Sequence, residues 1–123
     1  MAKILVIEDD AEVRELLNAL LSRAGHTVRE ARDGREGIHS FRTSPSDLII
    51  TDLIMPHKEG LETIIDLRQE FPDLKIIAIS GGSLGNRDNY LKTAKLCGAS
   101  RIFHKPFDNN ELLAAVHDLL NGS

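Results

Sequence analysis

Carboxylates follow two apolar runs in this 123-residue chain. Glu8 and Asp9 come directly after residues 4–7, and Asp52 comes directly after residues 48–51. An apolar run without polar alternation is typical of a strand that is covered on both faces, as in a parallel sheet. A single Asp at the end of a strand is more often a turn or helix-cap residue, so the role of Asp52 depends on which side chains lie beside it.

A hydroxyl group and a lysine come after two further segments of the same kind. Ser80 follows a predicted buried strand at residues 75–79, and Lys105 follows a short predicted strand at residues 101–104. The carboxyl ends of parallel strands lie at one edge of the sheet, which is where open α/β sheets bind ligands. We therefore expect the acids, Ser80 and Lys105 to lie together.

This combination of side chains indicates phosphoryl chemistry. Carboxylates held close together repel one another, and the pKa of at least one rises unless a cation offsets the charge. Mg²⁺ is commonly held by one or two carboxylates together with phosphate oxygens, and Lys105 adds a fixed positive charge. Such a site suits a phosphoryl group, whose transfer depends on positioning and charge neutralisation. Asp52 is then the natural nucleophile, giving an aspartyl phosphate.

The elements that must position these side chains alternate along the chain. Strands are predicted at residues 4–7, 27–31, 48–51, 75–79 and 101–104, and the charged segment 27–31 suits a sheet edge. Apolar residues at helical spacing separate and follow the strands. They include Val13, Leu16, Leu17, Leu20 and Leu21; Leu61, Ile64 and Ile65; Tyr90, Leu91, Ala94 and Cys97; and Leu112, Val116 and Leu119. Five strands alternating with five helices predict an α/β fold, a five-stranded parallel sheet with helices on both faces.

Composition limits the classes of function. The net charge is −4 and the 15 basic residues are scattered, which argues against a nucleic-acid surface. The apolar runs are too short for a signal peptide or a membrane span, so we expect a cytoplasmic protein with no membrane insertion. The single cysteine, Cys97, can form no internal disulfide. The size fits one domain over residues 1–123, without an effector domain.

The ordered set of motifs resembles the receiver domain of two-component response regulators. The motifs are Glu8-Asp9, Asp52 with Met55-Pro56 and Gly60, Ser80, and Lys105-Pro106, and the resemblance extends from Lys3 to Leu120. It implies a flavodoxin-like (βα)5 fold with strand order 2-1-3-4-5 and a site between the first and third strands.

The resemblance also implies roles for the acids. Asp52 corresponds to the phosphoacceptor, and Asp9 and the main-chain carbonyl of Ile54 correspond to Mg²⁺ ligands. Glu8 matches the first acid of the pair, where Asp is commoner, and it can reach the metal directly or through water. Asp10 matches a variable position and is better interpreted as a solvated charge or a helix N-cap.

Further residues correspond to phosphate contacts and to the signalling switch. Ser80 matches the hydroxyl that hydrogen-bonds the phosphoryl group, and Lys105 matches the lysine that pairs with it, followed by a cis peptide bond before Pro106. The family's aromatic switch residue is replaced here by Ile102. We therefore expect signalling to depend on the loop that starts at Gly81 and on the helix after it.

The expected function is that of a phosphoacceptor. The protein would receive a phosphoryl group on Asp52 from a histidine kinase or a histidine phosphotransfer protein and signal by protein contact. It would not be an enzyme, apart from assisting its own phosphotransfer and dephosphorylation. A phosphate sink or relay intermediate is an alternative, as is a degenerate receiver used only for binding. A haloacid-dehalogenase-like phosphatase would need a second Asp where this chain has Ile54.

Overall fold

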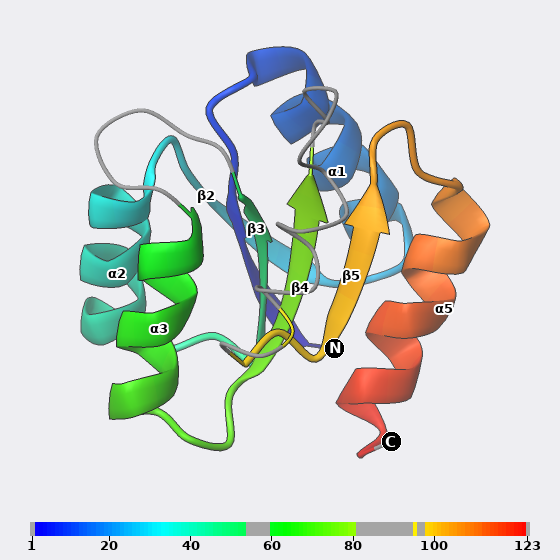
Figure 1. Ribbon diagram of the computed structural model, residues 1–123. Helices are drawn as coiled ribbons and strands as arrows, with labels where there is room; N and C mark the ends of the chain where they lie inside the picture. The colour runs from blue at the N-terminus through cyan, green and yellow to red at the C-terminus, as the bar shows by residue number, and fades with distance from the viewer. Residues whose placement is uncertain (1, 54–59, 81–94, 96–97, 123) are drawn as a thin grey trace.

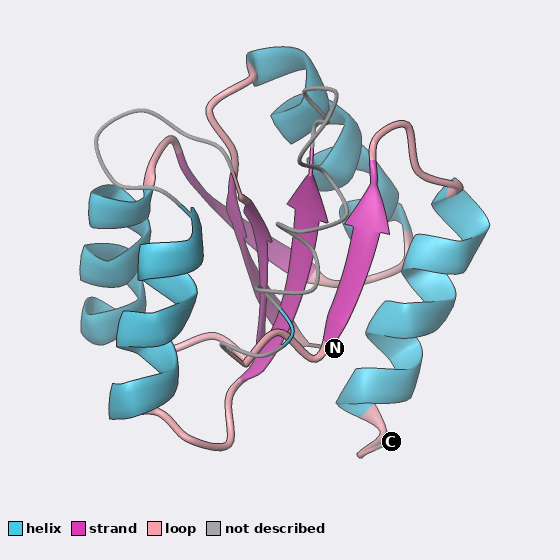
Figure 2. Cartoon of the chain, in the orientation of Figure 1, coloured by secondary structure: helices cyan, strands magenta, loops and turns pink. Residues whose placement is uncertain are grey.

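A single parallel sheet forms the centre of the molecule (Figures 1 and 2). A computed structural model describes residues 2–53, 60–80, 95 and 98–122. The five strands are β1 (Lys3–Ile7), β2 (Thr27–Ala31), β3 (Leu48–Asp52), β4 (Lys75–Ser80) and β5 (Arg101–His104). All four pairings are parallel, and the order is β2-β1-β3-β4-β5. The predicted fold class and strand order are confirmed.

Helices cover both faces of the sheet. The described residues contain α1 (Ala11–Arg23), α2 (Gly34–Thr43), α3 (Gly60–Glu70) and α5 (Asn109–Leu120). Helices α2 and α3 pack on one face, and α1 and α5 cover the other (Figure 1). The helix that the sequence predicts around Tyr90 and Cys97 lies outside the described residues. None of the described helices has the length and apolar content that a membrane span requires.

Strand alternation divides the core into two clusters, one on each face of the sheet. On β1, Leu5 and Ile7 belong to the cluster under α2 and α3, whereas Ile4 and Val6 belong to the cluster under α1 and α5. These four side chains are fully buried. A central strand buried on both faces needs an unbroken apolar sequence through its buried part, and in β1 the acid Glu8 comes only after that part.

The edge strand β2 has a different pattern. Thr27, Arg29 and Glu30 are exposed, Val28 is half-buried, and only Ala31 is fully buried. Charged side chains on an edge strand oppose pairing with a further strand. The prediction that residues 27–31 lie at a sheet edge is confirmed.

Two side chains that the sequence assigns to inner faces are exposed. Leu16 is 44% exposed on α1 and Ile65 is 37% exposed on α3. On α1 the buried stripe is centred on Leu17 and Leu21, and a residue one position away is rotated by about 100° around the helix axis. Both assignments were wrong because an apolar residue can border the buried stripe without entering it.

Aspartates cap the amino ends of α1 and α5. The Asp10 side chain accepts hydrogen bonds from the backbone N–H groups of Glu12 and Val13 at the start of α1. Asp108 accepts one from Glu111 N–H, at 3.0 Å, at the start of α5. These caps satisfy amide groups that the first helical turn leaves without partners. They fix where the chain leaves the carboxyl edge of the sheet.

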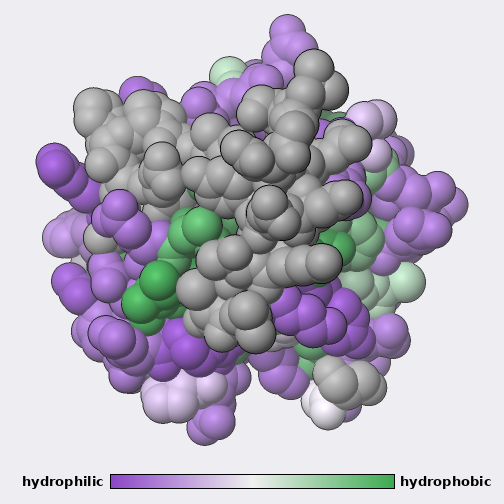
Figure 3. Space-filling view, viewed as in Figure 1, coloured by the Kyte–Doolittle hydropathy of each residue, from purple (hydrophilic) through white to green (hydrophobic). Residues whose placement is uncertain are grey.

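Most of the described surface visible in the space-filling view is hydrophilic (Figure 3). Apolar colour is confined to small areas of this view. Leu16 and Ile65 are the large apolar side chains that are exposed among the described residues. Scattered apolar side chains of this kind are normal on a monomeric surface.

Candidate functional site at the carboxyl edge of the sheet

Backbone hydrogen bonds hold the acidic residues at the carboxyl edge. Glu8 directly follows β1, and its N–H donates to the Ala31 carbonyl of β2 at 3.0 Å. Asp52 is the last residue of β3, and the next N–H, that of Leu53, donates to the Ile79 carbonyl of β4 at 2.9 Å. Both side chains are buried, with exposed fractions of 1% for Glu8 and 5% for Asp52.

The lysine and the hydroxyl come from the neighbouring strands. Ser80 ends β4, and its carbonyl accepts a 2.8 Å hydrogen bond from the Lys105 N–H just beyond β5. The Lys105–Pro106 peptide bond is cis. The Ser80 hydroxyl is buried and has no hydrogen-bond partner among the described residues. The sheet edge therefore contains a buried polar group that a further acceptor could satisfy.

Three carboxylates and one ammonium group meet at this edge. Glu8, Asp9 and Asp52 each place a carboxylate oxygen within 4.8 Å of the others. The Lys105 Nζ lies 2.7 Å from Glu8 Oε1 and 3.4 Å from Asp52 Oδ2. Lys105 is thus shared between two acids and lies nearer to Glu8. Oxygen donors at this spacing fit a hard divalent cation such as Mg²⁺.

The pKa values reflect the crowding of charge. Burial, and then the negative charge of Asp52, raise the pKa of Glu8 to about 7, although Lys105 and the Asp10 N–H partly offset them. Burial alone would lower the pKa of Lys105, but the hydrogen bond to Glu8 and the charges of Asp52 and Glu8 outweigh it and raise that pKa. The three carboxylates can carry more negative charge than one lysine balances, and this excess favours a bound cation.

Sequence reasoning missed Arg14, which anchors the acidic loop from behind. The Arg14 side chain donates to the carbonyl oxygens of Glu8 at 2.8 Å and Asp9 at 3.4 Å. Its Nε lies 3.8 Å from Glu30 on β2, and Glu30 also accepts a 2.8 Å hydrogen bond from Asn18. Nothing in the sequence signals this role, because it depends on the α1 side chain folding back onto the loop that precedes the helix.

Several predicted site residues cannot be placed. Ile54, Met55, Pro56 and Gly81 lie outside the described residues. Ile102 is half-buried and packs against the core cluster under α2 and α3, whereas Phe103 packs against the cluster on the other face.

Comparisons with known proteins agree with this arrangement. The family model of the response regulator receiver domain matches residues 4–117. The chain is 37% identical over 125 residues to the DNA-binding transcriptional regulator NtrC of Azospirillum brasilense, covering 99% of this chain and 25% of that protein. It is also 37% identical to the response regulator MprA of Mycolicibacterium vanbaalenii, covering 96% of this chain and 50% of MprA. The chain thus spans half or less of the length of these relatives.

A solved structure shows the same fold over nearly the whole chain. The receiver domain of NtrX from Brucella abortus superposes with a TM-score of 0.90 at 27% sequence identity, covering 98% of this chain and 99% of that domain. With the family match over residues 4–117 and the matching sheet order, these similarities show that the chain belongs to the response regulator receiver domain family.

Proposed function

We propose that Asp52 accepts a phosphoryl group from a phosphohistidine on a histidine kinase or a histidine phosphotransfer protein. A carboxylate oxygen of Asp52 attacks phosphorus, the phosphorus–nitrogen bond breaks, and the imidazole leaves, so that an acyl phosphate forms. The observation that carries the proposal is the contact of Lys105 with both Asp52 and Glu8 at the carboxyl edge. Its ammonium group supplies positive charge where phosphoryl oxygens would lie.

Glu8, Asp9 and Asp52 are the residues that would hold Mg²⁺, and Ile54 remains a predicted carbonyl ligand. The cluster of oxygens within 4.8 Å and the raised pKa of Glu8 both support a divalent cation here. When bound, the cation would neutralise charge on the phosphoryl oxygens. Ser80 would donate its hydroxyl hydrogen to one of those oxygens, giving that buried group a partner.

Signalling would follow from the new charge at the sheet edge. Phosphorylation adds a group with about −1.5 to −2 charges and three strong acceptor oxygens. We infer that Ser80 and Lys105 turn toward it. Because residue 102 is Ile102 and not an aromatic switch residue, we infer that the change reaches the surface through the segment after Ser80, beginning at Gly81. A partner protein would recognise that surface in the cytoplasm. That the chain is a single receiver domain without an effector domain stays a prediction.

Intact-mass spectrometry tests the phosphoacceptor directly. The protein is incubated with a small acyl phosphate or phosphoramidate, with Mg²⁺ or with EDTA. We expect wild type to gain the mass of one phosphoryl group only with Mg²⁺, and Asp52→Asn to gain none. Asp118→Asn, a change on the exposed face of α5, is the matched control and should be modified like wild type. Equal modification of Asp52→Asn and wild type would refute the assignment.

A further inference from the structure

A second polar site lies at the opposite edge of the sheet, near the amino ends of the strands. The pocket has a volume of about 530 Å³. It is formed by the turn before β2, by the residues at the starts of β3 and β4, and by the last turn of α5. Its polar and apolar lining includes His26, Asp47, Lys75, His117, Leu120 and Asn121. None of these residues belongs to the phosphoacceptor site.

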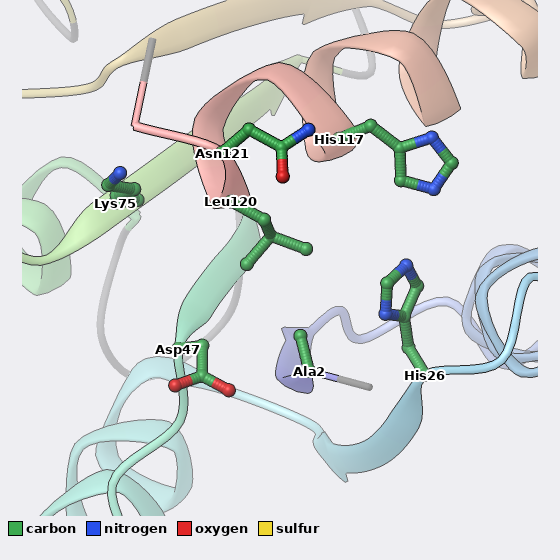
Figure 4. Close-up of a pocket in the computed structure, with 7 residues that line it drawn as sticks. All are labelled: Ala2, His26, Asp47, Lys75, His117, Leu120 and Asn121. Carbon is green, nitrogen blue, oxygen red and sulfur yellow. The ribbon is translucent and has the colours of Figure 1, made fainter.

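Two histidines face each other at one end of this pocket (Figure 4). The ring centroids of His26 and His117 are 5.6 Å apart, and the ring planes are tilted by 54°. In Figure 4 a ring nitrogen of His26 is directed toward the edge of His117 that also carries a nitrogen, while Asp47 and Lys75 lie at the other end. The pair therefore presents two nitrogen donors to one small volume.

Both histidines are attached to well-supported backbone. The His26 N–H donates to the Leu21 carbonyl at 3.1 Å, and the preceding Gly25 has a φ of 96°, in the left-handed region that favours glycine. The His117 carbonyl accepts a 3.0 Å hydrogen bond from the Asn121 N–H at the end of α5. The two rings are thus brought together by fixed elements and not by a loose loop.

The ring of His26 has unused bonding capacity. Both of its nitrogens are buried, and neither has a hydrogen-bond partner among the described residues. A neutral imidazole carries one donor and one acceptor, and buried polar atoms of this kind are normally satisfied by protein, water or an ion. Burial, and then the positive charge of His117, lower the pKa of His26. The lowered pKa favours the neutral ring, which has a lone pair that can bind an ion.

Asp47 and the carboxyl end of α5 supply negative charge that can offset part of the charge of a bound cation. The pocket lies at the carboxyl end of α5, where the helix dipole is negative. Lys75 already donates its ammonium to the Leu119 carbonyl, and Asp47 contributes a carboxylate that accepts a 2.8 Å hydrogen bond from the Lys3 N–H. Lys75, the lysine among the described residues that line this pocket, is thus bound to a main-chain oxygen.

We propose that His26 and His117 form a binding site for a transition-metal ion of the Zn²⁺ class. Two imidazoles that bind one Zn²⁺, at about 2.0–2.1 Å from each nitrogen, have ring centroids roughly 5 to 6 Å apart, and the observed separation is 5.6 Å. Imidazole donors select Zn²⁺, Cu²⁺ or Ni²⁺, whereas Mg²⁺ takes oxygen donors. Water completes the coordination from the open side. The bound ion joins the α1–β2 turn to α5.

Thermal unfolding with added Zn²⁺ tests the site, with excess Mg²⁺ present to keep Zn²⁺ from the acidic cluster. Because an ion that binds only the folded state stabilises it, we expect Zn²⁺ to raise the wild-type Tm by about 3–10 °C. For each variant, the Tm with Zn²⁺ is compared with the Tm of the same variant without Zn²⁺. The shift should disappear in His26→Gln and in His117→Gln, and His39→Gln, on the exposed face of α2, should keep it.

Cobalt absorption provides a second readout that does not depend on stability. Co²⁺ bound through imidazoles should produce visible absorption bands in wild type and His39→Gln, and the bands should weaken at least tenfold in His26→Gln. A Tm shift and Co²⁺ bands that persist in both His26→Gln and His117→Gln would overturn the proposal. So would the absence of any shift or bands in wild type.

Discussion

Lys105 is held more closely by Glu8 than by Asp52. Its nitrogen is 2.7 Å from the Glu8 carboxylate and 3.4 Å from that of Asp52. Glutamate is one methylene longer than aspartate, so at this position it can extend across the site to the lysine. Glu8 therefore acts as a counter-ion for Lys105 as well as a candidate metal ligand. In the proposed phosphorylation, the added charge on Asp52 would compete with Glu8 for the ammonium group.

Glu8→Gln should change how stability depends on pH when EDTA removes divalent ions. The pKa of Glu8 is raised to about 7 in the folded protein, from an ordinary value of 4.5, so the folded state favours the protonated form. The contribution of protonated Glu8 to the free energy of unfolding is complete below pH 4.5 and is lost as pH rises through 7. Glutamine cannot ionise, so the free energy of unfolding of Glu8→Gln should rise by up to about 3 kcal/mol relative to that of wild type as pH increases from 4.5 to 8.

Urea unfolding at several pH values measures this difference. Glu15→Gln, on the exposed face of α1, is the control and should follow the wild-type profile. A constant stability difference between Glu8→Gln and wild type from pH 4.5 to pH 8 would show that Glu8 is not the group that titrates.

At the scale of elements, Arg14 joins α1 and β2 to the loop that carries Glu8 and Asp9. Its side chain holds two carbonyl oxygens of that loop, and Glu30 lies on its other side. Arg14→Ala should lower Mg²⁺ affinity about tenfold, the low end of what is lost when a group that orients metal ligands is removed. Arg14→Lys keeps the charge but has fewer hydrogen-bond donors, so its Mg²⁺ affinity should lie between those of wild type and Arg14→Ala.

Isothermal titration calorimetry with Mg²⁺ separates this effect from a general loss of stability. Arg23→Ala, at the exposed end of the same helix, should bind Mg²⁺ like wild type. If Arg14→Ala lowered Tm but kept the wild-type Mg²⁺ affinity, Arg14 would be a structural residue only.

The contact between α2 and β1 leaves no room for a side chain at Gly37. A Cβ atom built there would lie 2.4 Å from Cδ1 and 2.8 Å from Cγ1 of Ile7. Ile7 is fully buried, so it cannot turn away without disturbing the cluster around it. Gly37→Ala should therefore destabilise the protein by about 1–3 kcal/mol, although alanine is the better helix former. Chemical denaturation measures this, and an increase in stability would mean that the helix shifts freely.

At the scale of the whole molecule, the sheet separates two cores. Ile64 of α3 lies in one cluster and Ile50 of β3 lies in the other. Ile64→Val and Ile50→Val should each cost about 0.5–1.5 kcal/mol, and the double variant should show their sum within about 0.5 kcal/mol. Urea denaturation of the four proteins completes the cycle. A coupling energy above about 1 kcal/mol would show that strain passes through the sheet.

The sequence predicts the parts of this molecule that depend on local pattern. Apolar runs locate the central strands, and the acids at their ends, Glu8 and Asp52, then lie at one edge because the strands are parallel. Arg14 and the His26–His117 pair are not predictable in this way. Their contacts join segments that are far apart in the sequence or depend on how a long side chain folds back, and periodicity contains no such information.

The exposed charges of β2 also govern how the protein behaves at high concentration. A second copy that lengthened the sheet at the β2 edge would have to lay a strand beside β2 and remove water from Arg29 and Glu30. Strand addition at the β2 edge is therefore opposed by desolvation, and this cost does not depend on a phosphoryl group at the carboxyl edge of the sheet.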